Sequence, residues 1–168
     1  MGNYNDLNTN KKYKVLFVCL GNICRSPAAQ GVMQRMIDER GLGDRFYLDS
    51  AGTYGGHAGE LPDRRMRVHA QRRGYNLTHR SRRVTGQDFE DFDVIVAMDS
   101  SNRYNLQEMA ASVEEAGKII MMGDYIRHYQ HYDHIPDPYY EGAEGFELVL
   151  NLLEDACEAL LEELVQAN

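Results

Sequence analysis

One segment of the sequence combines a thiol, an arginine and turn-forming residues in a pattern suited to chemistry on an anion. It reads Cys19-Leu20-Gly21-Asn22-Ile23-Cys24-Arg25-Ser26-Pro27. A cysteine thiolate is a nucleophile, and a guanidinium can grip a phosphate through two parallel hydrogen bonds. Gly21 and Asn22 are the residue types that best tolerate the left-handed backbone angles of a concave turn. The segment therefore predicts a phosphate-binding loop with Cys19 as the nucleophile.

The flanking residues place this loop between a strand and a helix. Residues 15–19 form a short apolar run, typical of a buried parallel strand. Ser26 is a good N-cap and Pro27 a good first helical residue, so we expect a helix from Pro27 to Gly41. Converging N–H groups and the helix dipole would attract an anion and favour the thiolate of Cys19, to which Ser26 could donate a hydrogen bond. The spacing from Cys19 to Arg25 alone is a weak signal, because Cys19 could then be an ordinary strand residue. The strand before the loop and the helix after it make the pattern far more specific.

Further strands are predicted over residues 46–51, 93–98 and 118–122. Helices are predicted between them: one over 62–73, a short one over 85–92, and one that starts at Asp99 or Ser100 and runs to near residue 104. Residues 123–144 form an unusually long loop, which is commonly functional in a compact domain.

A stripe of apolar residues at steps of three and four, from Phe146 to Leu164, predicts a final helix that packs on the core. Cys157 belongs to this stripe and is expected to be a core residue. The alternation of strands and helices predicts a single α/β domain with a parallel sheet. Sites in such sheets lie at the carboxyl ends of strands, which is where Cys19 stands.

Composition bounds the class of protein. The chain has 168 residues, of which 43% are hydrophobic and 26% charged, as in one globular domain with its own core. There is no apolar run long enough for a membrane span, so no membrane association is expected. Residues 1–12 are polar and lack a signal peptide's apolar stretch. We expect them to be a disordered leader before a domain over 13–168, in a cytoplasmic protein.

The cysteines and the charges indicate which cofactors and partners the protein is not expected to bind. Three cysteines form neither a disulfide framework nor a zinc-ligand pattern, so no metal or other cofactor is expected. The net charge is −8, yet eight arginines lie between Arg64 and Arg83. Most of these are expected to be solvated surface charges, although together they could attract an anionic substrate. An acidic chain without a recognisable binding motif is not expected to bind nucleic acid.

The loop from Cys19 to Pro27 resembles the phosphate loop of the low-molecular-weight protein tyrosine phosphatases, and the likeness covers about residues 13–165. Other segments resemble further parts of that family. They are Asp49-Ser50-Ala51-Gly52-Thr53 in the second strand, His57-Ala58-Gly59-Glu60-Leu61-Pro62-Asp63 in the substrate-wall loop, and Asp137-Pro138-Tyr139-Tyr140 in the general-acid loop.

The resemblance implies a four-stranded parallel twisted sheet with helices on both faces. It implies metal-free hydrolysis of phosphotyrosine in tyrosine-phosphorylated proteins, through a phosphocysteine on Cys19. Asp137 would protonate the leaving phenolate and then activate water. Arg25 and the loop would hold phosphate or another oxyanion. The loop residues so implied are Leu20, Gly21, Asn22, Ile23, Cys24 and Ser26.

Several of these residues also have a plainer interpretation. Asp-Pro is a common turn dipeptide, but its place in the long loop, followed by two tyrosines, favours the acid at Asp137. The resemblance makes Tyr139 and Tyr140 pocket walls that stack on the substrate ring, with Tyr54 opposite. Exposed Tyr139 and Tyr140 could also support weak self-association of an otherwise monomeric chain.

The remaining implied roles are structural or regulatory. Asn22, Ser50 and His79 correspond to a hydrogen-bond network that braces the loop, although His79 could equally be a surface histidine in an arginine-rich stretch. Cys24 corresponds to the family's resolving cysteine, which traps an oxidised Cys19 as a reversible disulfide.

Three alternatives remain open. A protein arginine phosphatase of the same fold would resemble this chain except for a Thr at the place of Ile23. A thiol-linked arsenate reductase needs further redox cysteines near residues 80–95, where the sequence has none. A non-catalytic phosphopeptide binder predicts loss of the nucleophile or the acid, and both are present.

Overall fold

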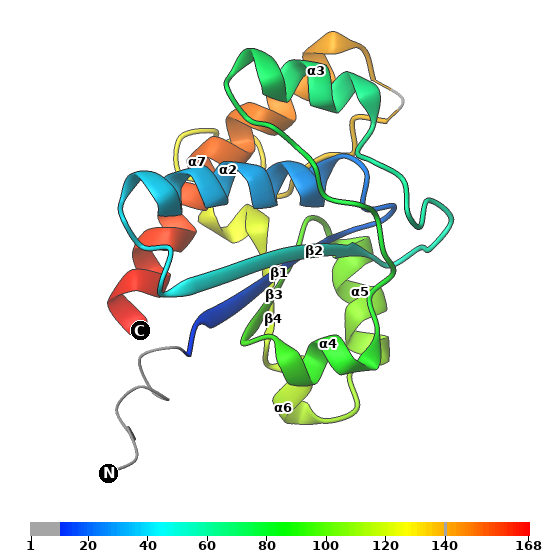
Figure 1. Ribbon diagram of the computed structural model, residues 1–168. Coiled ribbons are helices and arrows are strands. Elements are labelled where there is room, and N and C mark those ends of the chain that lie inside the picture. Colours follow the sequence, from blue (N-terminus) through cyan, green and yellow to red (C-terminus); the bar gives the residue numbers. More distant parts are fainter. Residues whose placement is uncertain (1–10, 140) are drawn as a thin grey trace.

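The computed structural model describes residues 11–139 and 141–168, and its centre is a four-stranded sheet (Figure 1). The strands are β1 (Tyr13–Cys19), β2 (Phe46–Gly52), β3 (Val94–Ala97) and β4 (Ile119–Met121). Their order is β2-β1-β3-β4 and every pair is parallel, which confirms the predicted sheet. Ten of the twelve residues of the predicted leader, and Tyr140, lie outside the described residues.

The central strand β1 is buried on both faces, as a parallel strand between two helix layers must be. Its last five residues are all buried, and they alternate between two separate hydrophobic cores. Val15, Phe17 and Cys19 face one core, whereas Leu16 and Val18 face the other. The continuous apolar run of the sequence is therefore the signature of two cores that share one strand.

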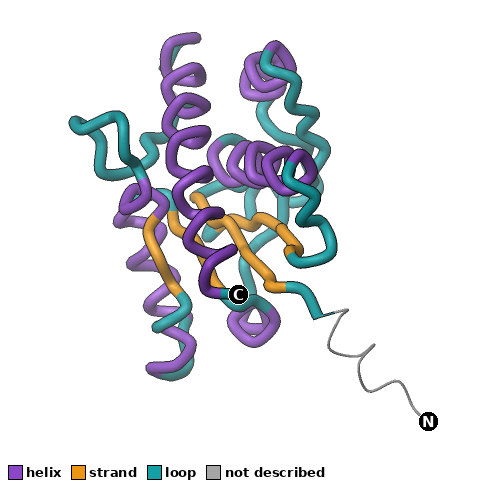
Figure 2. The backbone as a smooth tube through the Cα atoms, turned by 90° about the vertical axis from the view of Figure 1, so that its left-hand side faces the viewer, coloured by secondary structure: helices purple, strands orange, loops and turns teal. Residues whose placement is uncertain are grey.

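Helices cover both faces of the sheet, as predicted (Figures 1 and 2). On one side α2 (Arg25–Glu39) and α7 (Ala143–Ala167) pack on the larger core, and α3 (Arg64–Arg72) packs outside against α7. On the other side α4 (Gly86–Asp91) and α5 (Ser100–Met109) close the smaller core through Phe89 and Leu106. The short helix α6 (Val113–Ala116) leads into β4.

One prediction at the start of α2 is wrong. The helix begins at Arg25, two residues before Pro27, and its N-cap is Cys24 rather than Ser26. The Ser26 hydroxyl cannot serve as a cap because it is turned into the preceding loop, where it contacts the side chains of Cys19 and Asn22. Tertiary contacts thus override the local capping preference of serine.

Other boundaries shift by a few residues. Strand β2 extends to Gly52, at which a Cβ atom would lie 2.6 Å from the carbonyl oxygen of Leu20, so only glycine fits. Helix α5 runs to Met109, beyond the predicted end, and α7 starts before Phe146. The long loop after β4 begins with a 3₁₀ turn, η1 (Met122–Tyr125), which the sequence did not indicate.

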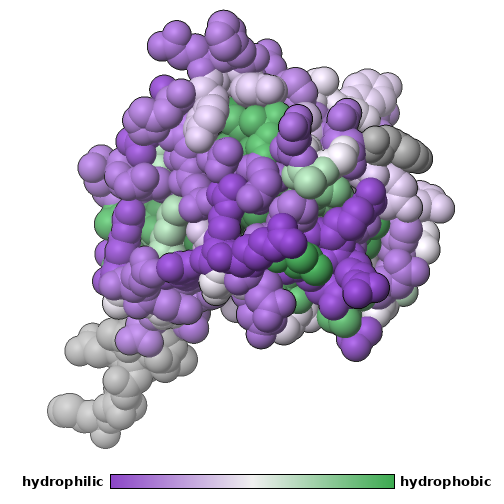
Figure 3. All heavy atoms as spheres, turned by 90° about the horizontal axis from the view of Figure 1, so that it is seen from above, coloured by the Kyte–Doolittle hydropathy of each residue, from purple (hydrophilic) through white to green (hydrophobic). Residues whose placement is uncertain are grey.

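The structure has the buried apolar core and the hydrophilic surface that the composition predicts (Figure 3). Cys157 is fully buried on the inner face of α7, as predicted. Viewed from above α3, the surface is largely hydrophilic and its hydrophobic patches are separate (Figure 3). Among the described helices, none combines the length and the apolar character that crossing a bilayer requires.

Candidate active site

The loop between β1 and α2 has the shape of an anion cradle. Asn22 adopts a φ of 58°, the left-handed conformation that its residue type predicted. Gly21 passes beneath the imidazole of His57, where a Cβ atom would lie 3.1 Å from Cδ2. The loop thus takes the left-handed conformation at Asn22, but not at Gly21, before it enters the N-terminus of α2, a place where backbone N–H groups and the helix dipole favour an anion.

Cys19 lies at the carboxyl end of β1, at the floor of this cradle, and is 3% exposed. Its Sγ atom is 3.0 Å from the Oγ atom of Ser26. A hydroxyl that donates to sulfur stabilises a thiolate, so this contact suits a nucleophilic cysteine.

A buried network centred on Asn22 braces the loop. Its Nδ2 donates to Ser26 Oγ at 2.8 Å and to Ser50 Oγ at 3.0 Å. Its Oδ1 accepts from His79 Nε2 at 2.9 Å and from the backbone N–H of Arg82 at 3.0 Å. The structure therefore brings together the three predicted bracing residues and adds two: Arg82, and Gln30, whose Oε1 accepts from Ser50 at 2.9 Å.

His79 is held in a half-buried position behind the loop. Burial lowers its pKa, and the positive charge of Arg82 acts in the same direction, although the Asp49 carboxylate opposes both. Because an amide oxygen can only accept, the Nε2 atom of His79 donates to Asn22. A neutral imidazole can do this, so the geometry fits structural support rather than proton transfer.

Arg25 is fixed by two partners that lie away from the cradle. It is 2% exposed, and its Nη1 donates to Asp99 Oδ2 at 2.6 Å and to the carbonyl oxygen of Ile135 at 3.0 Å. Burial works against its charge, but the neighbouring Cys19, Asp99 and Asp137 raise the pKa of Arg25 on balance. A permanently charged and immobilised guanidinium is well suited to hold an anion.

Asp137 lines the same pocket as Arg25 and lies beside it. Its Oδ2 is 3.6 Å from Arg25 Nη2, and its Oδ1 accepts from the backbone N–H of Tyr139 at 3.0 Å. The side chain remains 40% exposed. The carboxyl group is therefore oriented by its own turn and still reachable by a bound molecule.

These groups share one pocket of about 220 Å³. Its floor is the loop, and its walls carry the aromatic rings of Tyr54 and Tyr139. The structure thus places most of the predicted site residues around a single cavity; Tyr140 lies outside the described residues. The lining comprises Cys19, Leu20, Gly21, Ile23, Cys24, Arg25, Tyr54, His57, Asp137 and Tyr139.

Cys24 is a buried neighbour of Cys19. Burial raises its pKa, and the nearby Asp63, Cys19 and Asp137 add to this effect. Cys24 is therefore a protonated thiol at neutral pH, chemically unlike a cysteine at the centre of an anion cradle.

Two residues of the site were not singled out individually from the sequence. His57 was predicted only as part of the segment that resembles a substrate-wall loop; it lines the pocket, and its Nδ1 is 2.8 Å from Glu60 Oε2, which fixes the ring beside Tyr54. Asp99 was predicted only as a possible helix cap; it does cap α5 through Asn102, yet its other oxygen holds Arg25. Its position directly after a strand was the available signal, since parallel strands end at the same edge of a sheet.

The assembled groups are a nucleophile, a fixed cation and a reachable carboxyl group around a cradle for a tetrahedral anion. Such a set can transfer a phosphoryl group to sulfur and exchange a proton with the leaving group. Within residues 11–139 and 141–168, no group of three or more His, Cys, Asp and Glu side chains is arranged to hold a metal ion.

Comparison with known proteins gives a consistent result. The family model described as low molecular weight phosphotyrosine protein phosphatase matches residues 14–168. A Synechocystis protein assigned to the low molecular weight protein-tyrosine-phosphatases is 47% identical, over 90% of this chain and 96% of its own. A crystal structure of a protein tyrosine phosphatase from Entamoeba histolytica superposes with a TM-score of 0.90 at 44% identity, over 93% of this chain and 99% of that one. A crystal structure of a Drosophila arginine phosphatase superposes with a TM-score of 0.83 at 37% identity, over 89% of this chain and 96% of that one.

Proposed function

Because the chain belongs to the low molecular weight phosphotyrosine protein phosphatase family, a family of cysteine-dependent hydrolases, we propose that Cys19, Arg25 and Asp137 carry out its reaction. The protein is a protein-tyrosine phosphatase, and phosphorylated proteins are its substrates. The geometry of the pocket supports this assignment of the individual steps to residues.

In the first step the Cys19 thiolate attacks phosphorus while Arg25 and the loop amides hold the non-bridging oxygens. The bond between phosphorus and the phenolic oxygen breaks, and its electron pair stays on that oxygen. Asp137 supplies the proton that makes the phenol a stable leaving group. The products are a free tyrosine side chain and a phosphocysteine.

In the second step Asp137, now a carboxylate, takes a proton from water, and the resulting hydroxide attacks phosphorus. The phosphorus–sulfur bond breaks, which restores the Cys19 thiolate and releases phosphate. The Ser26 hydroxyl, 3.0 Å from Sγ, stabilises the thiolate as leaving group. Neither step requires a metal ion.

The observation that carries this proposal is the convergence of three groups from distant parts of the chain on one pocket. Cys19 forms its floor, Arg25 reaches it from the first turn of α2, and Asp137 closes its side 3.6 Å from the arginine. A protein that only bound phosphopeptides would have no use for a nucleophile and an acid in this arrangement.

The walls favour an aryl phosphate. Tyr54 and Tyr139 can flank a phenyl ring, and aromatic contacts of this kind are worth roughly 0.5–1.5 kcal/mol each. Ile23 adds an apolar contact. We therefore propose phosphotyrosine as the preferred phospho-residue, with the shorter phosphoserine excluded because its phosphate cannot reach the floor of the pocket.

Phosphoarginine is the second candidate, since a relative of the same fold is described as an arginine phosphatase. Ile23 is the residue that separates the two hypotheses. Its side chain offers no hydroxyl to a guanidinium, so the wild-type pocket should disfavour phosphoarginine, and Ile23→Thr should shift the preference towards it.

The test is turnover of phosphotyrosine, phosphoserine and phosphoarginine peptides side by side. We expect phosphotyrosine to be hydrolysed with the highest kcat/KM. Cys19→Ser should abolish turnover but retain phosphate or vanadate binding, and Arg25→Ala should lose both. Wild-type turnover by Cys19→Ser would refute the mechanism, and equal kcat/KM on the three peptides would refute the argument from the walls.

A further inference from the structure

Arg65, in the first turn of α3, contacts the segment that carries Asp137, although it does not line the pocket. Its Nη2 donates to the carbonyl oxygen of Tyr139 at 3.0 Å. Its guanidinium also faces two aromatic rings, with the centroid of Tyr139 at 5.4 Å and that of Phe146 at 4.9 Å. One side chain thus contacts both Tyr139, two residues after Asp137, and Phe146, in the first turn of α7.

Asp63 fixes Arg65 from the other side. Its Oδ1 lies 3.1 Å from Arg65 Nε and its Oδ2 lies 3.0 Å from Arg65 Nη2, a two-point ion pair with the geometry that a planar guanidinium prefers. Asp63 is the N-cap of α3 and accepts from the backbone N–H of Arg65 at 2.8 Å. Its own N–H donates to the carbonyl oxygen of Ile23, in the phosphate loop, at 2.7 Å.

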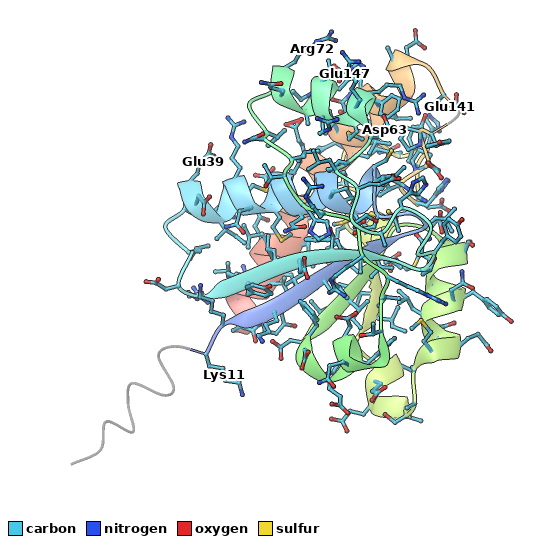
Figure 4. All side chains as sticks on the ribbon, turned by 45° about the vertical axis from the view of Figure 1, so that its right-hand side comes forward. Lys11, Glu39, Asp63, Arg72, Glu141 and Glu147 are labelled. Carbon is cyan, nitrogen blue, oxygen red and sulfur yellow. The ribbon has the colours of Figure 1, made fainter. Side chains whose placement is uncertain are left out.

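Phe146 anchors the far end of the segment. Its ring is stacked on His69, with centroids 5.6 Å apart and planes at 7°, while Arg65 lies over it as well. Arg65 and His69 are one helical turn apart and so lie on the same face of α3. Figure 4 shows Asp63 at the start of α3 and Glu147, the residue after Phe146, nearby on α7. Tyr139 and the first turn of α7 are therefore held against this face of α3.

These contacts form a continuous path from the phosphate loop to the acid. It runs from Ile23 to Asp63, from Asp63 to Arg65, from Arg65 to the backbone of Tyr139, and from the Tyr139 N–H to Asp137 Oδ1. We propose that Arg65 is a positioning residue, which sets the distance between the Asp137 carboxyl group and the nucleophile loop. This inference rests on the proposed role of Asp137 as the general acid.

The consequence is specific to the proton-transfer part of the reaction. A general acid works only within hydrogen-bond reach of the leaving oxygen, and a misplacement of about 1 Å can cost roughly 100-fold in rate. Loss of Arg65 would loosen the acid loop while Cys19 and Arg25 keep their own supports. Substrates whose leaving group needs a proton should suffer, and substrates that leave as stable phenolates should not.

The experiment compares Arg65→Ala and Arg65→Lys with a matched control, Arg64→Ala, which removes an exposed arginine one residue away on the same helix. The measurement is kcat/KM over a series of aryl phosphates with leaving phenols of graded acidity, because kcat/KM reports the step in which the phenol leaves. For Arg65→Ala we expect about a 10-fold loss on phosphotyrosine and under about 3-fold on the most acidic phenol. The loss on phosphotyrosine is smaller than the roughly 10²–10⁴-fold that general acid catalysis supplies, because the acid is displaced rather than removed. Arg64→Ala should match the wild type throughout.

Two further measurements separate positioning from a general structural effect. Vanadate affinity should be unchanged in both Arg65 variants, because the phosphate loop retains its own network. In the Asp137→Ala background, Arg65→Ala should no longer alter the leaving-group dependence, since the group that it positions is gone. If Arg65→Ala fails to fold, Arg65→Lys decides the question, because it keeps the charge and loses the planar two-point contact.

An equal loss across the series, no loss on phosphotyrosine, or an Arg65 effect that persists in Asp137→Ala would overturn the inference. If Asp137→Ala itself left the leaving-group dependence unaltered, the proposed role of Asp137 would fail instead. The two failures are therefore distinguishable in one set of variants.

Discussion

Replacement of Asn22 by Ala tests how the phosphate loop is held, because this side chain is fully buried and makes four hydrogen bonds. Each such bond contributes about 0.5–1.5 kcal/mol net, so the four together contribute roughly 2–6 kcal/mol. The loss of stability is reduced because Ser26 still contacts Cys19 and Ser50 still donates to Gln30. It is increased because alanine is strained at a φ of 58°. We expect the free energy of unfolding to fall by about 3–5 kcal/mol.

Asn22→Gly separates the hydrogen bonds from the backbone conformation. Glycine loses the same four bonds but adopts the left-handed conformation without the roughly 1–2 kcal/mol that alanine incurs. The unfolded Asn22→Gly chain has more conformational freedom than the unfolded Asn22→Ala chain. This difference offsets about 0.4–1 kcal/mol of the stability that glycine gains at this position. Asn22→Gly should therefore be more stable than Asn22→Ala by roughly 0.5–1 kcal/mol.

The assay is urea unfolding of both variants and of Ser50→Ala. This variant removes the hydrogen bonds of Ser50 to Asn22 and Gln30 and should lose about 1–3 kcal/mol. Vanadate affinity, measured alongside, should fall with the stability in the two Asn22 variants because the cradle loses its shape. A loss of less than 1 kcal/mol in Asn22→Ala, or a glycine variant less stable than the alanine variant, would refute this account of the loop.

Three further predictions follow from the surroundings of the site. Asp137→Ala should slow phosphotyrosine turnover by roughly 10²–10⁴-fold and slow aryl phosphates with acidic phenols less; equal losses would make Asp133 the next candidate acid. Mild peroxide should inactivate the enzyme reversibly, and Cys24→Ser should make the loss less reversible; mass spectrometry that finds no Cys19–Cys24 disulfide after partial oxidation would exclude this. Burial lowers the pKa of His79, so the unfolded chain takes up its proton first as the pH falls below about 6.5, and stability should decline there. His79→Gln should show a shallower decline between pH 7.5 and 5, and an equal decline would contradict the role of burial.

Local patterns were sufficient to predict the turn that contains Asn22, the strand before it and the helix after it. The apolar run of β1 identified a strand buried on both sides, and the residue type of Asn22 anticipated its left-handed conformation. Both features depend on neighbours in sequence, which is why the pattern alone could reveal them. The same argument explains the success with α7, whose apolar stripe is continuous from Phe146 to Leu164.

What the sequence could not predict depends on contacts between distant residues. Ser26 has the local preference of an N-cap, but its partners come from the loop, so the helix begins two residues earlier than a Ser26 cap would require. His57 reaches the pocket only because its loop folds over Gly21. Arg65 and Tyr139 are 74 residues apart, and no periodicity in the chain relates them. Each of these contacts depends on how helices, strands and loops pack together. The sequence pattern predicts the helices and strands themselves, but not their packing.

The order of the strands explains why these distant groups meet. Because β1 lies between β2 and β3, the residues at its carboxyl end are flanked on one side by Ser50 of β2 and on the other by Asp99, two residues past the end of β3. The first neighbour supports Asn22, in the middle of the phosphate loop, and the second holds Arg25, at its end, so the loop is fixed from both sides of β1. Asp137 needs a separate support, since its loop extends beyond the sheet, and α3 provides it through Arg65. The nucleophile is thus positioned by the sheet and the acid by a helix outside it, which is why a substitution in α3 should alter proton transfer while anion binding is retained.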